Sequence, residues 1–339
     1  MKTYKSLRYI DQLALFKLRG IQGISLKVHH SSTRELIELN KQLNTISTLG
    51  YYNLKNYAEP YLNNSTKNYE NLYFNDLIAR YYRDKHLKQA VLHAIEDIET
   101  TLNTKIAHVL GEYSPYGYLD FRVWCQRDSK NKFLKNKMMD KFTIESEQAN
   151  FLKEIIFKIK KSYSKDMQFF THSTDKVYPP IWLLMNELTL GSTIHIYKLM
   201  SKQNKRKISN YFGCKSDELV SWLENINLIR NICCHNGTLC DFKLKTKAKV
   251  PTEVKEKKIL VKTNSTYTNR LAFQLCIIIK LMSKINPKYS YNDMKKALYS
   301  LINNKTTPEY YGFIDKSAID KLFKINPNDI ALNNNLIEY

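Results

Sequence analysis

The residues best suited to chemistry in this chain lie close together near position 230. They are a cation, two amides and an imidazole: Arg230, Asn231, His235 and Asn236. Such a set suits RNA cleavage without a metal, because the ribose 2′-OH attacks the phosphate, a histidine moves protons and an arginine binds the phosphorane charge. The alternative is a helix end where arginine and histidine only cap backbone carbonyls, since short motifs also arise by chance.

An amphipathic helix is expected to carry these residues. One apolar stripe recurs at helical spacing and consists of Leu219, Trp222, Leu223, Ile226, Ile229 and Cys233. Ser216 stands where an N-cap is expected, and Gly237 is placed to leave the helix through a left-handed turn. We therefore predict a helix over about 217 to 236, in which Asn231 and His235 share a face.

Six segments of the chain follow the order of motifs of one known protein family. The strongest are PPIWLLMNELTLGSTIHIYKLM at 179–200, SWLENINLIRNICCHN at 221–236 and YGF at 311–313. Upstream lie LRGI at 18–21, LGYYNLKNYAEPYL at 49–62 and AIEDIE at 94–99. Over about 18 to 313 the chain resembles the D/F-type abortive-infection family of bacterial phage-defence proteins, a branch of the HEPN superfamily.

The resemblance implies a nuclease motif carried by Arg230, Asn231 and His235, with Asn236 beside it. In HEPN ribonucleases two such motifs meet across a dimer, so a homodimer is implied. Relatives in the family are linked to small structured noncoding RNAs that act as antitoxins. A cognate small noncoding RNA is therefore the implied partner, and the implied activity is that of a metal-independent endoribonuclease toxin.

Two positions depart from the family pattern. Relatives often carry arginine where this chain has Lys88 and Asn103, and arginine alone offers a planar bidentate donor. A non-catalytic RNA-binding partner in a defence ribonucleoprotein is thus a second hypothesis. A DNA-binding regulator is a third, although the chain has no helix-turn-helix signal.

Two carboxylates are second-tier candidates for the same site. Glu187 follows the Pro179–Pro180 pair, on a segment expected to pack near the motif helix, where it could pair with Arg230 or orient His235. Glu99 carries the same ambiguity. A buried carboxylate beside an arginine is more often a structural ion pair than a catalytic base.

The charge balance favours a polyanionic partner. The chain of 339 residues has 53 basic and 32 acidic residues, which leave a formal charge of +21. A lysine-rich proteome from an AT-rich genome is the alternative explanation. Candidate phosphate contacts come from two of the basic clusters and are Lys202, Lys205, Arg206, Lys207, Lys243, Lys245, Lys247 and Lys249.

Aromatic residues add one further candidate for RNA binding. Among 24 tyrosines, one pair lies between two arginines in the order Arg80, Tyr81, Tyr82, Arg83, where unpaired bases could stack. The alternative is that tyrosines on amphipathic helices are half-buried core residues.

Cysteine usage and hydropathy favour a cytoplasmic protein with no metal and no cofactor. The six cysteines lack the spacing of zinc ligands and are expected to be reduced. We expect no signal peptide, and the longest apolar run, residues 271–282, is too short to cross a bilayer.

The fold is predicted to be all-α, a HEPN-like helical bundle with helical N- and C-terminal extensions. Helices are expected within about 76 to 111, from near Ser32, and after Pro179–Pro180. The alternating lysines suggest an extended arm, with a small β-hairpin near 243–262. We divide the chain into an N-terminal portion (1–70), a HEPN-like core (71–240) and a basic arm with a C-terminal helical portion (241–339).

Overall fold

The computed structural model describes residues 6–26, 32–245 and 248–325 of the chain. These residues are mostly helical, and their strands form two separate hairpins of two strands each. The all-α prediction is therefore confirmed. Within the described ranges, no helix combines the length and the apolar character that crossing a membrane requires.

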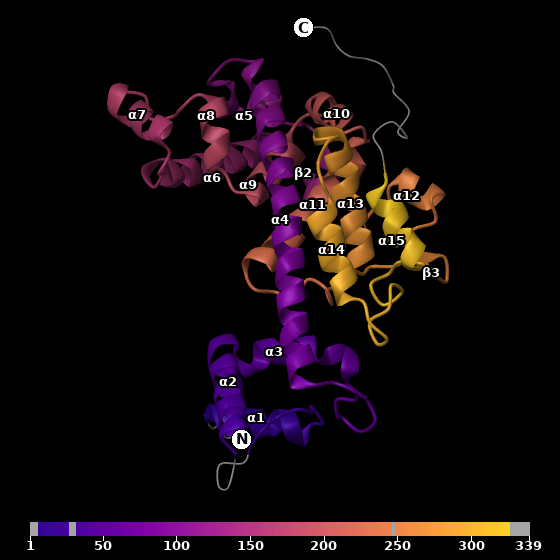
Figure 1. Ribbon diagram of the computed structural model, residues 1–339. Coiled ribbons are helices and arrows are strands. Elements are labelled where there is room, and N and C mark those ends of the chain that lie inside the picture. Colours follow the sequence, from indigo (N-terminus) through magenta and orange to yellow (C-terminus); the bar gives the residue numbers. More distant parts are fainter. Residues whose placement is uncertain (1–5, 27–31, 246–247, 326–339) are drawn as a thin grey trace.

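The first three helices pack at one end of the molecule, around the beginning of α4 (Figure 1). They are α1 (Tyr9–Leu18), α2 (Thr33–Leu49) and α3 (Tyr51–Tyr57). Helix α2 starts as predicted, because the Ser32 side chain accepts a hydrogen bond from the Glu35 backbone while the Glu35 carboxylate accepts one from the Ser32 N–H.

One long helix, α4 (Phe74–Gly111), runs from this end into the body of the molecule (Figure 1). Its 38 residues span about 57 Å at 1.5 Å per residue. One apolar stripe of this helix is buried throughout and consists of Val91, Ile95, Ile98, Leu102, Ile106 and Val109. Because α4 contacts α3, α11, α13 and α14, it is the common support of the whole fold.

The middle of the chain forms a series of helices. They are α5 (Phe121–Trp124), α6 (Lys141–Lys160), α7 (Lys165–Ser173), α8 (Ile181–Leu184), α9 (Leu190–Leu199), α10 (Lys202–Tyr211) and α11 (Ser216–Cys234). Of these, α8, α9, α10 and α11 pack against α4. Helix α8 follows Pro180, as predicted. The hairpin of β1 (Lys130–Asn131) and β2 (Lys137–Met138) was not predicted.

The last part of the chain packs against α4 and α11. It contains α12 (Thr252–Glu256), α13 (Leu271–Ile285), α14 (Asn292–Leu301) and α15 (Lys316–Phe323). The long apolar run seen in the sequence forms α13, which is buried on all sides from Leu271 to Ser283. Helix α13 lies beside α11, and α14 packs along α4 (Figure 1).

The predicted hairpin exists, but at a different place. Strands β3 (Lys262–Thr263) and β4 (Thr266–Tyr267) pair in antiparallel orientation at the end of the predicted range. Asn264 and Ser265 join them with positive φ values, as a tight hairpin turn requires. Much of the predicted range is occupied instead by irregular chain and by α12.

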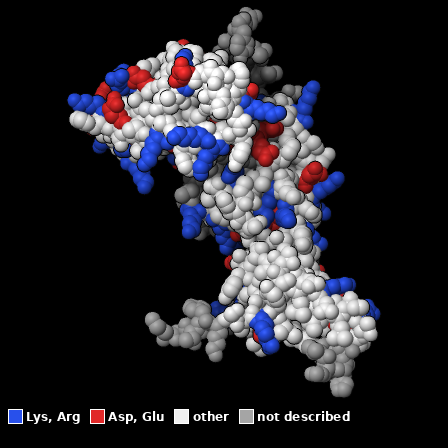
Figure 2. Space-filling view, turned by 90° about the vertical axis from the view of Figure 1, so that its left-hand side faces the viewer, with Lys and Arg blue, Asp and Glu red and all other residues white. Residues whose placement is uncertain are grey.

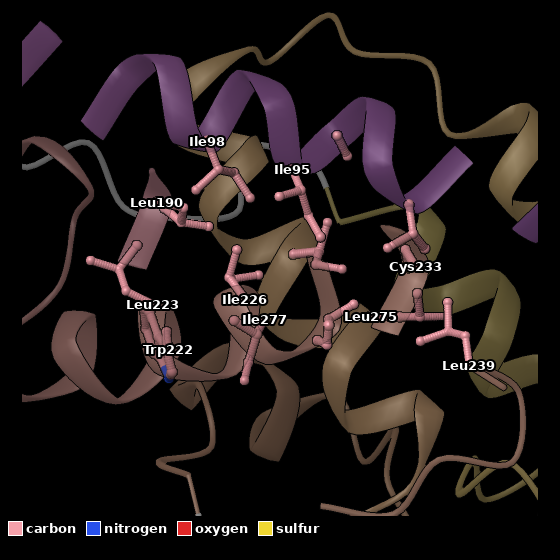
Figure 3. Packing of buried hydrophobic residues seen from close by; sticks show 14 of the residues in the cluster. Ile95, Ile98, Leu190, Trp222, Leu223, Ile226, Cys233, Leu239, Leu275 and Ile277 are labelled. Atoms are coloured by element: carbon pink, nitrogen blue, oxygen red, sulfur yellow. The ribbon is translucent and has the colours of Figure 1, made fainter. Parts of the chain in front are cut away.

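Side chains of α4, α9, α11 and α13 form the core around the middle of α4. Figure 3 shows Ile95 and Ile98 of α4 facing Leu223 and Ile226 of α11, with side chains of α9 and α13 beside them. The buried stripe predicted for the motif helix is confirmed at every position. Each such side chain contributes about 1.5–3 kcal/mol on burial, so α11 is firmly fixed to α4.

Candidate functional site

The end of α11 exposes the candidate motif to solvent. The helix ends at Cys234, and the backbone N–H of His235 donates to the Asn231 carbonyl at 3.0 Å. The left-handed residue is Asn236 (φ 55°), not Gly237 as predicted, because asparagine tolerates this conformation well. Gly237 is required for another reason, since a Cβ there would lie 2.8 Å from Ile232 Cγ2.

The start of α11 also differs from the prediction. Ser216 is the first residue of the helix and not its cap, because its hydroxyl shares a 3.1 Å hydrogen bond with that of Ser209. Glu218 takes over part of the capping by accepting a hydrogen bond from the Lys215 N–H at 2.9 Å. Helix α11 is therefore tied to the end of α10.

The four motif side chains differ in their surroundings. Asn231, His235 and Asn236 are exposed, whereas Arg230 is half-buried. Among the described residues, none forms a hydrogen bond or ion pair with the side chain of His235 or of Asn231. Both groups are consequently available to a ligand or to a second chain.

Arg230 lies beside Glu99, which α4 contributes to the site. Burial raises the pKa of the Glu99 carboxyl, while the Arg230 guanidinium and the backbone N–H of Leu190 favour its charged form. The two side chains form no ion pair in the described part of the chain, so their attraction acts over a longer distance. Glu99, Arg230 and the start of α9 thus form one junction of three helices.

Glu187 is not part of this junction. Its carboxylate accepts a 2.8 Å hydrogen bond from the hydroxyl of Ser162, in the loop between α6 and α7. The prediction that Glu187 pairs with Arg230 or orients His235 is therefore wrong. Glu187 is the last residue of a 3-10 turn, Met185–Glu187, that directly follows α8.

The two positions that depart from the family pattern are both buried in protein contacts. Asn103 is 7% exposed and accepts a hydrogen bond from the Thr193 hydroxyl at 2.8 Å. Lys88 is 6% exposed and donates to the Gly237 carbonyl at 3.0 Å. Lys88 therefore holds the chain directly after the motif, a role that a compact ammonium can fill.

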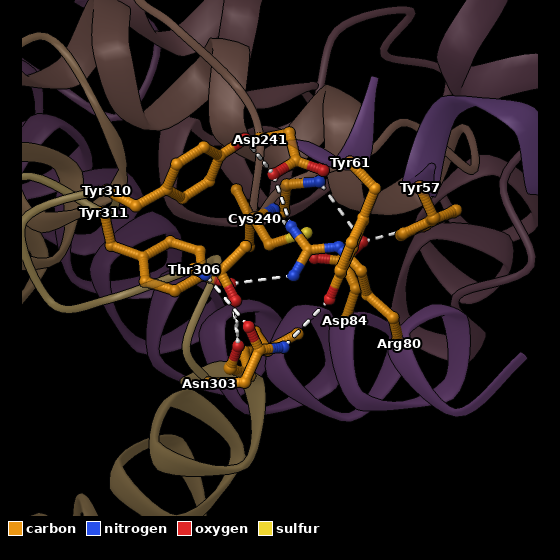
Figure 4. Close-up of polar contacts among 12 residues, drawn as sticks. Tyr57, Tyr61, Arg80, Asp84, Cys240, Asp241, Asn303, Thr306, Tyr310 and Tyr311 are labelled. Carbon is orange, nitrogen blue, oxygen red and sulfur yellow. Dashed lines mark hydrogen bonds and ion pairs between the residues drawn. The ribbon is translucent and has the colours of Figure 1, made fainter. Parts of the chain in front are cut away.

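Asp84 continues this contact one helical turn earlier on α4 (Figure 4). Its fully buried carboxylate accepts hydrogen bonds from the backbone of Leu239 at 3.2 Å and of Cys240 at 2.8 Å. The Tyr57 hydroxyl donates to it at 2.8 Å, and Lys88 lies 3.6 Å away. Asp84 thus connects α3, α4 and the segment that follows the motif.

Arg80, one further turn back, binds the end of the same segment. Its guanidinium contacts the Asp241 carboxylate at 2.5 Å and the Tyr311 hydroxyl at 2.9 Å. Arg80, Asp84 and Lys88, spaced four residues apart on one face of α4, together hold residues 237–241; we call these three residues the α4 clamp. Asp84 was not predicted as a site residue, although a charge at this spacing inside an apolar stripe is a usable signal.

The proposed contact of Arg80 and Tyr81 with RNA is wrong, because both side chains are buried. Arg80 is 3% exposed, and Tyr81 packs edge-on against Tyr57 with ring centres 5.4 Å apart. Tyr82 and Arg83, the other two members of this candidate set, are exposed.

The first basic cluster is only partly available to a partner. Lys202, Arg206 and Lys207 are exposed on α10, and Lys207 pairs with Glu112. Lys205 is 3% exposed and donates to the Lys198 carbonyl, so it does not face a partner. Burial and the neighbouring Lys132 lower the pKa of Lys205 to about 8.

The second basic cluster belongs to the part of the chain that follows the residues held by the α4 clamp, and its last lysine, Lys249, lies against α11. Lys243, Lys245 and Lys249 are exposed, while Lys247 lies outside the described residues. The Trp222 indole donates to the Lys249 carbonyl at 2.7 Å, which holds this segment against the helix. On the face seen in Figure 2, lysine and arginine side chains gather over the wide part of the molecule, and the narrow N-terminal part is mostly uncharged.

Metal ligation finds no support in the part of the chain that the structure describes. No three residues of the types His, Cys, Asp and Glu come together there as a metal site. The cysteines in this part are all free thiols.

Comparison with known proteins gives one match. A family model described as Abi-like protein matches residues 44–241, which is more than half of the chain. The matched range begins within α2 and ends at Asp241, so it includes α4, the motif at the end of α11 and the segment held by the α4 clamp. Searches of curated proteins and of solved structures found no significant match.

Proposed function

We propose, because the chain belongs to the Abi-like protein family, that it is an RNA-binding endoribonuclease toxin of abortive infection, controlled by a small structured RNA. Membership in this family indicates a role in abortive infection, a bacterial defence against phage. The nuclease part of the proposal rests on one observation. Asn231 and His235 are exposed at the end of α11, and no described residue forms a hydrogen bond or ion pair with either side chain.

The residues at the end of α11 can divide the chemistry of RNA cleavage. His235 takes the proton from the 2′-OH or returns one to the leaving 5′-oxygen, and Arg230 binds the negative charge of the phosphorane. Asn231 and Asn236 offer amide donors to the non-bridging oxygens. The nucleophile belongs to the RNA, so the protein has to supply only proton transfer and charge stabilisation.

A second protein copy would complete the site, because one motif supplies one imidazole and the reaction needs both a base and an acid. A motif with exposed Asn231 and His235 side chains fits a composite site formed by two-fold symmetry, as the resemblance to HEPN ribonucleases implies. We expect light scattering to give about twice the chain mass of 40.0 kDa. A mass of one chain, both with and without RNA, would remove the basis for the composite site.

RNA binding is expected to be strong and sensitive to salt. Because the formal charge is +21, binding a folded RNA should release many counterions. The protein purified at low ionic strength should carry one discrete small RNA, identified by sequencing. Affinity should fall about tenfold or more between roughly 50 and 200 mM salt. Recovery of only mixed bulk RNA would argue against a cognate partner.

A non-catalytic RNA-binding partner is the second candidate. Asn103 favours it, because this side chain is hydrogen-bonded to Thr193 where relatives often place an arginine. Incubation of the purified protein with RNA in EDTA separates the two functions. New ends with 2′,3′-cyclic phosphates support the nuclease, and intact RNA that remains bound supports the binding protein.

A further inference from the structure

A pocket of about 510 Å³ lies at the start of α4, away from the end of α11. Its walls come from three parts of the chain: the loop before α4, the first turns of α4, and the loop after α14. This volume is within the range of small-molecule sites, which is about 300–1,000 Å³. The pocket therefore has the size of a site for a mononucleotide.

The charge around this pocket is unbalanced. Arg83 and Lys305 line it and are exposed, and neither side chain has a hydrogen bond or ion pair within the described part of the chain. Asp76 is the one acidic residue of the lining, and it pairs with neither of them. Two unpaired cations facing one cavity attract an anion, and arginine in particular binds phosphate through its planar fork.

Arg80 adds a buried guanidinium to the same wall. It is 3% exposed, and its terminal nitrogens are occupied by Asp241 and Tyr311. The remaining donor, Nε, is buried without a partner, as is Oδ2 of Asp241. This wall of the pocket is thus polar and rigid, and two buried polar atoms at it have no hydrogen-bond partner among the described residues.

Amide groups complete the lining and fix the position of Lys305. The Asn303 side chain accepts hydrogen bonds from the backbone of Lys305 at 2.8 Å and of Thr306 at 2.9 Å, and donates to the Tyr61 hydroxyl at 2.9 Å (Figure 4). The loop that carries Lys305 is therefore held against the N-terminal part. Asn71 and Asn304 add exposed amides that can hydrogen-bond a base or a ribose.

We propose that this pocket binds the phosphate of a nucleotide-sized ligand between Arg83 and Lys305. The ligand is either a free mononucleotide or a phosphorylated RNA end. Because Arg80 forms part of the wall and also binds Asp241, an occupied pocket stabilises the segment that follows the motif. That link to the motif rests on the proposed function, whereas binding itself does not.

Titration calorimetry with 5′-AMP, with inorganic phosphate and with a 5′-phosphorylated RNA oligonucleotide tests the proposal on the full chain. The variant Arg83→Ala/Lys305→Ala removes both cations. The control Lys85→Ala/Lys296→Ala removes the same charge from exposed positions on α4 and α14 that do not line this pocket. All four positions are on the surface, so circular dichroism should be unchanged in both variants.

We expect saturable binding that the pocket variant weakens about tenfold or more, while the control stays within about twofold. Saturable binding of 5′-AMP identifies a free nucleotide as the ligand, whereas an effect on the 5′-phosphorylated oligonucleotide alone identifies an RNA end. Equal losses in both double variants, or no saturable binding of any probe, would overturn the proposal. His235→Ala should leave 5′-AMP binding intact, so a failure of the nuclease function is distinguishable from a failure of this site.

Discussion

Replacement of His235 by alanine is expected to lower RNA cleavage by roughly 10²–10⁴-fold and to abolish toxicity, with little change in RNA binding. The imidazole is exposed and has no partner in the described chain, so its removal leaves no buried group unsatisfied. It supplies one proton-transfer step, whereas affinity comes from many phosphate contacts. End-labelled RNA assays with and without EDTA measure the rate, and filter binding measures the affinity.

A matched control is His108→Ala, because His108 is an exposed histidine near the end of α4 and outside the motif. It should cleave RNA at the normal rate. Arg230→Ala should lose cleavage as His235→Ala does, and should also bind RNA more weakly near the scissile phosphate, because a charge-assisted bond is lost. If His235→Ala cells remain fully protected against phage and equally sensitive to the toxin, the nuclease hypothesis fails.

The second large effect concerns the α4 clamp. We expect Asp84→Ala to lower the free energy of unfolding by about 3–5 kcal/mol. The substitution leaves the backbone N–H groups of Leu239 and Cys240 and the hydroxyl of Tyr57 without an acceptor in a buried place. It also removes the carboxylate that lies 3.6 Å from the buried ammonium of Lys88.

Urea denaturation followed by circular dichroism measures this loss. Asp97→Ala is the matched control, since Asp97 lies on the same helix, is partly exposed and forms no ion pair with any residue that the structure describes; it should change the stability by less than about 0.5 kcal/mol. The stability loss of Asp84→Asn should lie between those of Asp84→Ala and Asp97→Ala, because the amide keeps one acceptor oxygen. A loss below about 1 kcal/mol for Asp84→Ala would contradict the structural role of the clamp.

Local periodicity predicted the helices but not the partners of their charged residues. The stripes of α4 and α11 follow the 3.6-residue repeat, and both helices were predicted within a few residues of their bounds. Arg80, in contrast, binds Asp241, which is 161 positions away in the sequence. No local pattern contains that information, so a buried arginine was mistaken for a surface residue.

Lys205 shows the same limit within a basic cluster. Its neighbours Lys202, Arg206 and Lys207 are exposed, as expected for a charged run. Lys205 instead points inward on the amphipathic helix α10, where its ammonium lies 4.7 Å from the ring centre of Phe133 and reaches the Lys198 carbonyl. The apolar body of lysine permits this position, but composition alone cannot distinguish it from its neighbours.

The residue types and their order were enough to recognise the motif, whereas the contacts that hold the surrounding chain in place were not predicted. The apolar stripe of α11 ends at Cys233, as predicted, and the motif residues Asn231, His235 and Asn236 are exposed. The contacts of Lys88 and Asn103 with Gly237 and Thr193 depend on how three helices meet, which the sequence does not state.

Because α4 is one unbroken helix that carries both the α4 clamp and the apolar stripe, the fold is sensitive to insertions and deletions within it. One inserted or deleted residue between Arg80 and Leu102 would rotate everything beyond it by about 100° around the helix axis. The clamp residues and the apolar stripe that faces α11 would then point in incompatible directions. We therefore expect an insertion or deletion within this stretch of α4 to disrupt the fold, whereas substitutions at its exposed positions leave the register of the helix unchanged.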